Sequence, residues 1–256
     1  MQRKSASEQA TLRGRMVVIT RPAGTASALA RNVRARGGQP LLLPGLSLRG
    51  VTDVVATRAA LRLALGADLI IFSSPAAVRH AAALLPLRTT ASVLAVGQGT
   101  AAALRRQGIS EPLVPPRQDS EGLLRVAALR DLGGRDVALI GAAGGRGLLR
   151  QQLVERGARL REVHVYQRLP PRLDRRHVEP LLRLPATARV LLSSAEALQH
   201  LCRLLPAPAL TRLCAATAVV SSERLAEAAR QAGFVRITQA SSALSDDLLR
   251  AAACAD

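Results

Sequence analysis

The chain contains an internal repeat, and this repeat restricts the possible folds more than any other feature of the sequence. Residues 71–86 read IFSSPAAVRHAAALLP and residues 191–206 read LLSSAEALQHLCRLLP, an offset of 120 positions. The same offset aligns residues 17–37 with residues 137–157, and the offset grows to 125 towards the end of each copy. Several matches in one order indicate two similar units within the 256 residues.

Each unit alternates short apolar runs, which favour buried strands, with longer Ala-, Leu- and Arg-rich segments, which favour helices. The predicted strands are 17–20, 69–72, 93–96, 137–140, 190–192 and 218–220. The predicted helices are 25–36, 75–85, 100–107, 120–129, 146–156, 195–205, 223–232 and 245–253. This alternation predicts an α/β fold with two doubly wound parallel-sheet domains. Residues 39–49 and 159–168 alternate apolar and polar side chains, which predicts exposed extended strands that connect the domains.

The charge balance first suggests a nucleic-acid binder, because Lys+Arg number 36 and Asp+Glu number 18. The only lysine is Lys4, however, so arginine supplies 35 of these cations and is scattered along the chain. The aromatic residues are Phe72, Tyr166 and Phe234 alone, too few for a surface that stacks bases. We therefore expect no nucleic-acid partner.

Other features exclude further classes of protein. Cys202, Cys214 and Cys254 are odd in number and lack CxxC spacing, which argues against a disulfide framework and a zinc site and favours the cytoplasm. No apolar run approaches ~18 residues, so no membrane span is expected. Residues 1–14 are polar and lack the apolar core of a signal peptide, which predicts a disordered tail.

A set of short motifs points to a known family. In order, the motifs are VITRP at 18–22, FSSxxAV at 72–78, AVGxxT at 95–100, DSEGLL at 119–124, GGRxLL at 144–149, VYQR at 165–168 and SSERLAEAARQAGF at 221–234. Each motif is only a strand–helix turn, but the ordered set, over roughly residues 16–250, resembles the uroporphyrinogen-III synthase family.

The resemblance implies a specific division of the chain. Residues 15–40 and 170–256 would form a first, discontinuous domain, and residues 50–160 would form a second. Residues 41–49 and 161–169 would be the connector strands, paired as a two-stranded β connector.

The resemblance also implies an enzyme, a cyclising hydro-lyase of haem and sirohaem biosynthesis. It would close hydroxymethylbilane, a linear tetrapyrrole, to uroporphyrinogen III by loss of water and inversion of the last ring, ring D. The family is thought to proceed through an azafulvene and a spiro intermediate, with no metal and no cofactor. A cytoplasmic monomer that receives its substrate from hydroxymethylbilane synthase is expected.

Candidate site residues lie where predicted strands end and helices begin, because free N–H groups there favour the carboxylates of such a substrate. The predicted substrate-binding residues are Arg21, Ser73, Ser74, Gly97, Thr100, Gly144, Gly145, Arg146, Ser193, Ser194 and Ser222. The resemblance assigns a catalytic role to Tyr166, whose hydroxyl would assist the departing hydroxide. Simpler readings remain: the serines and Thr100 as helix caps, the glycines as a tight turn, and Tyr166 as a packing residue.

The histidines and carboxylates provide no second catalytic constellation. His80 and His200 coincide in the repeat, but both lie within predicted helices without ligand spacing, so a structural role is expected. The main alternative to the enzyme is a two-domain small-anion binding or sensor protein without catalysis. Hydroxymethylbilane turnover distinguishes the two.

Overall fold

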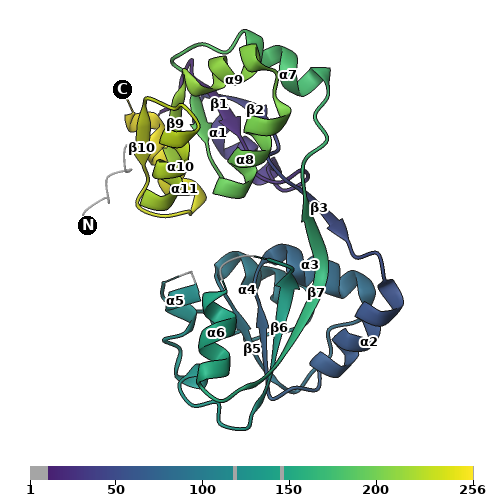
Figure 1. Cartoon of the computed structure of the whole chain (residues 1–256). Coiled ribbons are helices and arrows are strands. Elements are labelled where there is room, and N and C mark those ends of the chain that lie inside the picture. The colour runs from purple at the N-terminus through teal and green to yellow at the C-terminus, as the bar shows by residue number, and fades with distance from the viewer. Residues whose placement is uncertain (1–10, 118–119, 145–146, 256) are drawn as a thin grey trace, which may run out of the picture. The chain divides into compact units, whose positions relative to one another are not determined.

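The computed structural model describes residues 11–117, 120–144 and 147–255 of the chain. These residues form two compact units, which we treat separately (Figure 1). Unit one consists of the chain up to Ser47 and from Leu169 onward, and unit two of Leu48–Arg168. The candidate site residues are therefore divided between these two units.

Unit one is a five-stranded sheet with helices on both faces. Its strands, in spatial order, are β10 (Ile237–Gln239), β9 (Thr217–Val220), β8 (Arg189–Leu191), β1 (Met16–Ile19) and β2 (Gln39–Leu42). Each neighbouring pair is parallel. The helices are α1 (Ser27–Ala35), α7 (Arg175–Leu182), α8 (Ala195–Leu204), α9 (Ala207–Cys214), α10 (Glu223–Gln231) and α11 (Ser245–Cys254).

Side chains alternate between the two faces of this sheet, and each face has its own core. Val18 of β1 packs with the cluster that α7, α8, α9 and α10 cover. Val17 and Ile19 pack instead with α1 and α11. A strand buried on both faces is a continuous apolar run in the sequence, and this run is what predicted a strand at residues 17–20.

Unit two repeats this plan. Its strands, in spatial order, are β3 (Ser47–Gly50), β7 (Arg159–Leu169), β6 (Asp136–Ala142), β4 (Leu69–Phe72) and β5 (Ser92–Ala95). Its helices are α2 (Val54–Ala64), α3 (Pro75–Leu84), α4 (Gln98–Arg105), α5 (Ser120–Leu123) and α6 (Leu148–Glu155), with one 3₁₀ turn, η1 (Ala127–Leu129).

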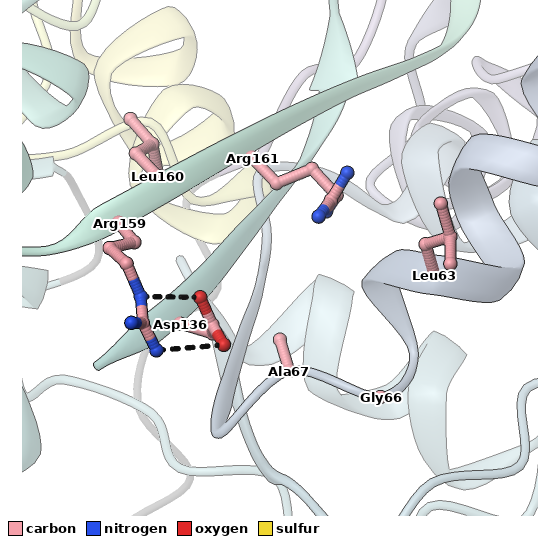
Figure 2. A pocket seen from close by; sticks show the side chains of 7 residues that line it. All are labelled: Leu63, Gly66, Ala67, Asp136, Arg159, Leu160 and Arg161. Carbon is pink, nitrogen blue, oxygen red and sulfur yellow. Dashed lines mark hydrogen bonds and ion pairs between the residues drawn. The ribbon is translucent and has the colours of Figure 1, made fainter. Parts of the chain in front are cut away.

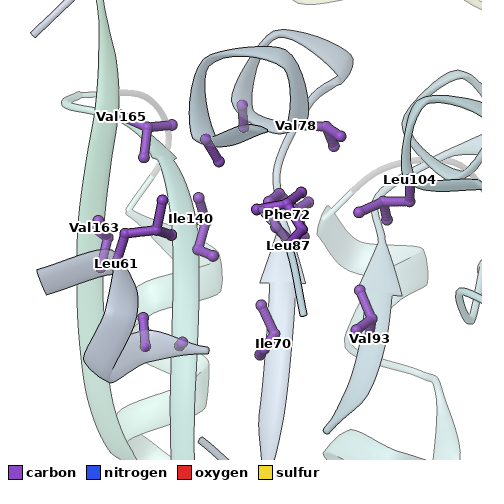
Figure 3. Packing of buried hydrophobic residues seen from close by; sticks show 14 of the residues in the cluster. Leu61, Ile70, Phe72, Val78, Leu87, Val93, Leu104, Ile140, Val163 and Val165 are labelled. Atoms are coloured by element: carbon purple, nitrogen blue, oxygen red, sulfur yellow. The ribbon is translucent and has the colours of Figure 1, made fainter. Parts of the chain in front are cut away.

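The larger core of unit two lies under α2, α3 and α4. Ile70 and Phe72 of β4 pack there with Val93 of β5 and Ile140 of β6 (Figure 3). Burial of each such side chain contributes about 1.5–3 kcal/mol. Leu69 and Ile71 face the opposite side, where α5 and α6 close a second core. The α/β fold with two doubly wound sheets of mainly parallel strands is thus confirmed.

The internal repeat is visible in the elements themselves. An offset of 120 carries α3 onto α8, and an offset of 125 carries β5 onto β9. The isolated parallel bridge between Leu94 and Leu113 corresponds in the same way to the pairing of Val219 with Thr238.

Several predicted segments differ from the observed ones. Residues 39–42 form β2, an edge strand of the first sheet, so the early part of the predicted connector belongs to a regular sheet. The predicted helix 120–129 is α5 followed by η1, because the chain turns between them with hydrogen bonds from Arg125 to Gly122 and from Val126 to Leu123. The helices α2 and α9 were not predicted. No helix in the described residues is long and apolar enough to cross a membrane.

Candidate functional site

A pocket of about 580 Å³ lies in unit two, where β4 and β6 end and β7 runs beside them. Its polar lining includes Ser73, Ser74, Glu162, His164, Tyr166 and Arg168. The carboxyl edge of a parallel sheet is where doubly wound folds bind their ligands. The pocket therefore lies where the fold predicts a site.

The two serines after β4 have different structural roles. The Ser73 N–H donates to the carbonyl of Ile140 at 3.0 Å and so extends the sheet by one residue. The Ser74 Oγ accepts the N–H of Ala77 at 3.0 Å and caps the N-terminus of α3. Ser74 is therefore a cap, as the simpler reading held, and also part of the pocket wall.

Two glycines keep the pocket open to the backbone. A Cβ on Gly141 would collide with the hydroxyl of Ser73, so no larger residue fits there without a shift. Gly144 has a φ of 78°, a left-handed conformation that glycine adopts without steric cost. A carboxylate could therefore approach the main chain closely at this turn.

Four polar side chains of β7 reach the pocket. Glu162, His164, Tyr166 and Arg168 lie two residues apart and all line it; alternation accounts for Glu162 and His164, whereas Tyr166 packs in the same core cluster as its neighbour Val165. The register between β6 and β7 shifts at Gly141 and Ala142, close to Tyr166. Such irregularities commonly re-aim side chains beside functional sites.

Tyr166 has its ring in the core and its hydroxyl at the pocket. Only 6% of the residue is exposed, and it belongs to the apolar cluster under α3. Its hydroxyl lies 3.2 Å from the Oγ of Ser74, at hydrogen-bond distance. Tyr166 thus both packs and presents a polar group, so the two readings from sequence are compatible.

Cationic groups add to this wall. The Arg150 Nε lies 2.8 Å from a carboxylate oxygen of Glu162, and the Arg168 guanidinium donates to the carbonyl of Ala143 at 3.3 Å. Sequence reasoning did not select these three charged residues. Alternation from Tyr166 along the strand could have found Glu162 and Arg168, whereas nothing in the sequence indicates that Arg150 of α6 meets them.

Four predicted residues lie at the corresponding edge of unit one. The Ser193 Oγ donates to the carbonyl of Thr20 at 2.9 Å, whereas Ser194 and Ser222 cap α8 and α10. The Arg21 guanidinium donates to the hydroxyl of Ser245 at 3.2 Å, and burial lowers the pKa of Arg21. These residues follow the ends of β1, β8 and β9, so the sheet gathers them at one edge.

The remaining predicted residues lie elsewhere in unit two. Gly97 is the N-cap of α4, and Thr100 is the third residue of that helix, with 3% of its surface exposed. The prediction that Thr100 caps this helix is therefore wrong, because the helix begins two residues earlier. Gly145 and Arg146 lie outside the described residues.

A second pocket, of about 390 Å³, lies at the opposite edge of the same sheet, where β6 and β7 begin. Figure 2 shows Asp136 and Arg159 there, joined by two hydrogen bonds of 3.0 and 3.2 Å. The two side chains neutralise each other's charge. The amino ends of strands lie at this edge, whereas the helix N-termini that favour anions lie at the other. The pocket around Tyr166 is thus the better candidate site.

The histidines do not form a metal centre in the part of the chain that the structure describes. No group of three His, Cys, Asp or Glu side chains there is placed to hold a metal ion. His177 bonds to the cap residue Asp174 at 2.8 Å, and His200 bonds to the carbonyl of Gly45 at 3.1 Å. Their contacts are those of structural residues.

Comparison with known proteins gives a consistent result. The family described as "Uroporphyrinogen-III synthase HemD" matches residues 27–250. The uroporphyrinogen-III synthase of Salmonella typhimurium is 31% identical over 250 residues, covering 92% of this chain and 98% of that protein. The same-named protein of Escherichia coli is 32% identical over 251 residues, with the same coverage.

Solved structures agree at the level of fold. A mutant uroporphyrinogen III synthase from Thermus thermophilus superposes with a TM-score of 0.60 at 23% identity, covering 92% of this chain and 96% of that one. A uroporphyrinogen-III synthetase from Helicobacter pylori gives a TM-score of 0.57 at 14% identity, with the same coverage.

Proposed function

The chain belongs to the uroporphyrinogen-III synthase family, and on that premise we propose that it works through the pocket around Tyr166 in unit two. The protein is an enzyme of tetrapyrrole biosynthesis that cyclises a linear tetrapyrrole, hydroxymethylbilane, to uroporphyrinogen III. The observation that supports this location is a single buried phenol, Tyr166, in the lining of a pocket that Arg150 and Arg168 also line.

The first step of the reaction is departure of hydroxide from the hydroxymethyl carbon, which leaves an azafulvene. The hydroxide leaves as water if a nearby acid donates a proton to it. We assign this proton donation to the hydroxyl of Tyr166, because the ring of Tyr166 is buried in the core while the residue lines the pocket. The ring then closes after inversion of ring D.

Ser74 can support the phenol during this step. Its Oγ already accepts the N–H of Ala77, so its own hydroxyl hydrogen is available to the Tyr166 oxygen 3.2 Å away. A hydrogen bond to the oxygen that loses its proton stabilises the developing phenolate. The cap of α3 thus serves the reaction as well as the helix.

The other polar residues that line the pocket can bind the carboxylates of the substrate. The substrate carries an acetate and a propionate on every ring, and guanidinium groups bind carboxylates well. We propose that Arg150, Arg168 and the N–H groups near Gly144 hold carboxylates in unit two. Arg21, Ser193, Ser194 and Ser222 of unit one, with Gly97, Thr100, Gly145 and Arg146, remain proposed contacts for other parts of the chain-like substrate.

Tyr166→Phe tests the catalytic assignment, because it removes the hydroxyl and keeps the ring. We expect kcat for uroporphyrinogen III formation to fall about 10- to 100-fold, while KM stays within about threefold. The measurement is single-variant kinetics on freshly prepared hydroxymethylbilane, with the rate in buffer alone subtracted. A variant with full turnover and an unchanged melting temperature removes Tyr166 from the chemistry.

We also propose where the reaction takes place, how the substrate is delivered and in which oligomeric state the enzyme acts. Hydroxymethylbilane closes unaided to the wrong isomer, so direct handover from hydroxymethylbilane synthase would protect it. We propose a cytoplasmic monomer; Cys202, Cys214 and Cys254 are all free thiols, which accords with a reducing compartment. Light scattering of the purified protein, with and without the synthase, checks both the monomer and the handover.

A further inference from the structure

His80 of α3 lies flat against the ring of Tyr166. The two ring centroids are 5.2 Å apart and the ring planes are inclined by 16°, which is a stacked arrangement. His80 is half-buried. The same helix therefore meets Tyr166 twice, at the hydroxyl through its cap Ser74 and at the ring face through His80.

We propose that His80 is a positioning residue that fixes the plane of the Tyr166 ring and thereby aims its hydroxyl at the pocket. This proposal deepens the proposed function and depends on it for its catalytic consequence. A hydrogen bond at the hydroxyl fixes the oxygen but not the rotation of the ring plane about the axis from Cβ to this oxygen, and the ring plane sets the direction in which a phenol O–H points. A flat group stacked on one face removes that freedom, and small displacements of a reacting group are costly.

The repeat supplies an internal comparison. The residue that corresponds to His80 in unit one is His200, in the same position of α8. The residue that corresponds to Tyr166 there is Leu46, and His200 bonds instead to the carbonyl of Gly45. Both helices thus carry an imidazole at one position, but only in unit two does it face a phenol.

The charge state of His80 suits stacking. Its pKa is lowered by burial and, to a lesser degree, by the positive charge of Arg79 on the same helix. The imidazole is therefore uncharged near neutral pH, and it covers the ring without adding a cation beside the proton donor.

The composition of the chain makes this contact directly observable. Tyr166 is the only tyrosine and there is no tryptophan, so intrinsic fluorescence reports this one ring. We expect His80→Ala to increase quenching of Tyr166 by acrylamide about twofold, because one ring face is uncovered, and His80→Leu to increase it less, because leucine still covers that face. His80→Phe restores a flat neighbour and should keep the wild-type quenching constant.

Kinetics then test the catalytic consequence. We expect His80→Leu to lower kcat about tenfold with KM within about twofold, and His80→Phe to stay within about threefold of wild type. The leucine variant fills the space of the imidazole, so a folding defect is less expected than for alanine, and melting temperatures are compared for every variant.

His200→Ala is the matched control, because it removes the corresponding imidazole in unit one. It should leave both the quenching constant and kcat at wild-type values. Unchanged quenching in His80→Ala, or a kcat in His80→Phe as low as in His80→Leu, overturns the proposal. If the wild-type protein fails to form uroporphyrinogen III, the proposed function fails, while the quenching series still decides whether His80 holds the ring.

Discussion

Arg189 shows how one residue can support a whole unit. It begins β8 and is only 1% exposed, yet it carries a full positive charge. Its guanidinium donates to the carbonyls of Thr187 at 2.8 Å and Ala252 at 3.0 Å, and also to that of Ala255. The last two are carbonyls at the end of α11, where helices leave acceptors unsatisfied and favour cations.

We therefore predict that Arg189→Leu destabilises the protein by about 2–4 kcal/mol, because it leaves several buried carbonyls without a donor. Arg189→Lys should recover only part of this loss, since an ammonium cannot reproduce the planar set of donors. Urea unfolding followed by circular dichroism measures both. Equal stability of the leucine variant and the wild type would show that the buried guanidinium contributes nothing net.

At this scale, some residues of the candidate pocket could be predicted from the sequence and others could not. Ser73, Ser74 and Gly144 could be selected because their types and their positions after strands carry the information, and Tyr166 because the family resemblance assigns it a role. Arg150 could not, because the point where a helix side chain meets a strand side chain depends on how the two elements pack. His80 was read as a structural histidine for the same reason.

At the scale of elements, the N-terminus of α7 has an unusually complete cap. The Asp174 carboxylate accepts the backbone N–H of Arg176 at 3.0 Å, and the Arg176 guanidinium lies 2.8 Å from it. The Nδ1 of His177 lies 2.8 Å from the same carboxylate and 3.2 Å from the backbone nitrogen of Asp174; it donates to the first or accepts from the second, according to the tautomer. Hydrogen bonds from Arg176, and next from His177, lower the pKa of Asp174 from 3.8 to about 2.

The sign of this shift predicts a pH dependence. Because the folded-state pKa lies below the unfolded one, the ionised carboxylate stabilises the fold above about pH 4, and the contribution disappears as pH falls towards 2. Asp174→Ala should therefore melt below the wild type at neutral pH and at nearly the same temperature near pH 2. Asp174→Asn, which keeps a capping oxygen, is the control. A difference that stays constant with pH would exclude the charge as its cause.

Helix starts illustrate what local sequence can and cannot specify. The sequence placed α3 and α8 within one residue of their observed ends, because a serine cap precedes a long apolar stretch in each. From the sequence, α4 was predicted to begin at Thr100, because threonine caps helices more often than the residues beside it. Gly97 is the cap instead, in an extended conformation, and Thr100 turns into the core. Burial decided this start, and burial is not a local property.

At the scale of the whole molecule, the repeat and the folded units do not coincide. Unit two is one continuous segment, whereas unit one joins β1, α1 and β2 to the C-terminal elements. The offset of 120 is compatible with two arrangements. Each half of the chain could fold as its own unit, or the two halves could exchange their first strand–helix–strand segments. Both arrangements align the same residues in the sequence, so the repeat alone could not distinguish them.

The internal repeat also explains why the two units can differ in role. Both units carry a serine cap and a histidine at equivalent positions, but unit one has Leu46 at the position of Tyr166. We therefore expect unit two to supply the acid and unit one to supply contacts to the substrate.

The central claim is that this chain directs ring closure to one isomer. The most direct test is to incubate the purified protein with freshly made hydroxymethylbilane, oxidise the products and separate the isomers by chromatography. The account predicts that uroporphyrin III predominates and that its share falls in Tyr166→Phe. Isomer I alone, formed at the rate seen in buffer, would contradict it.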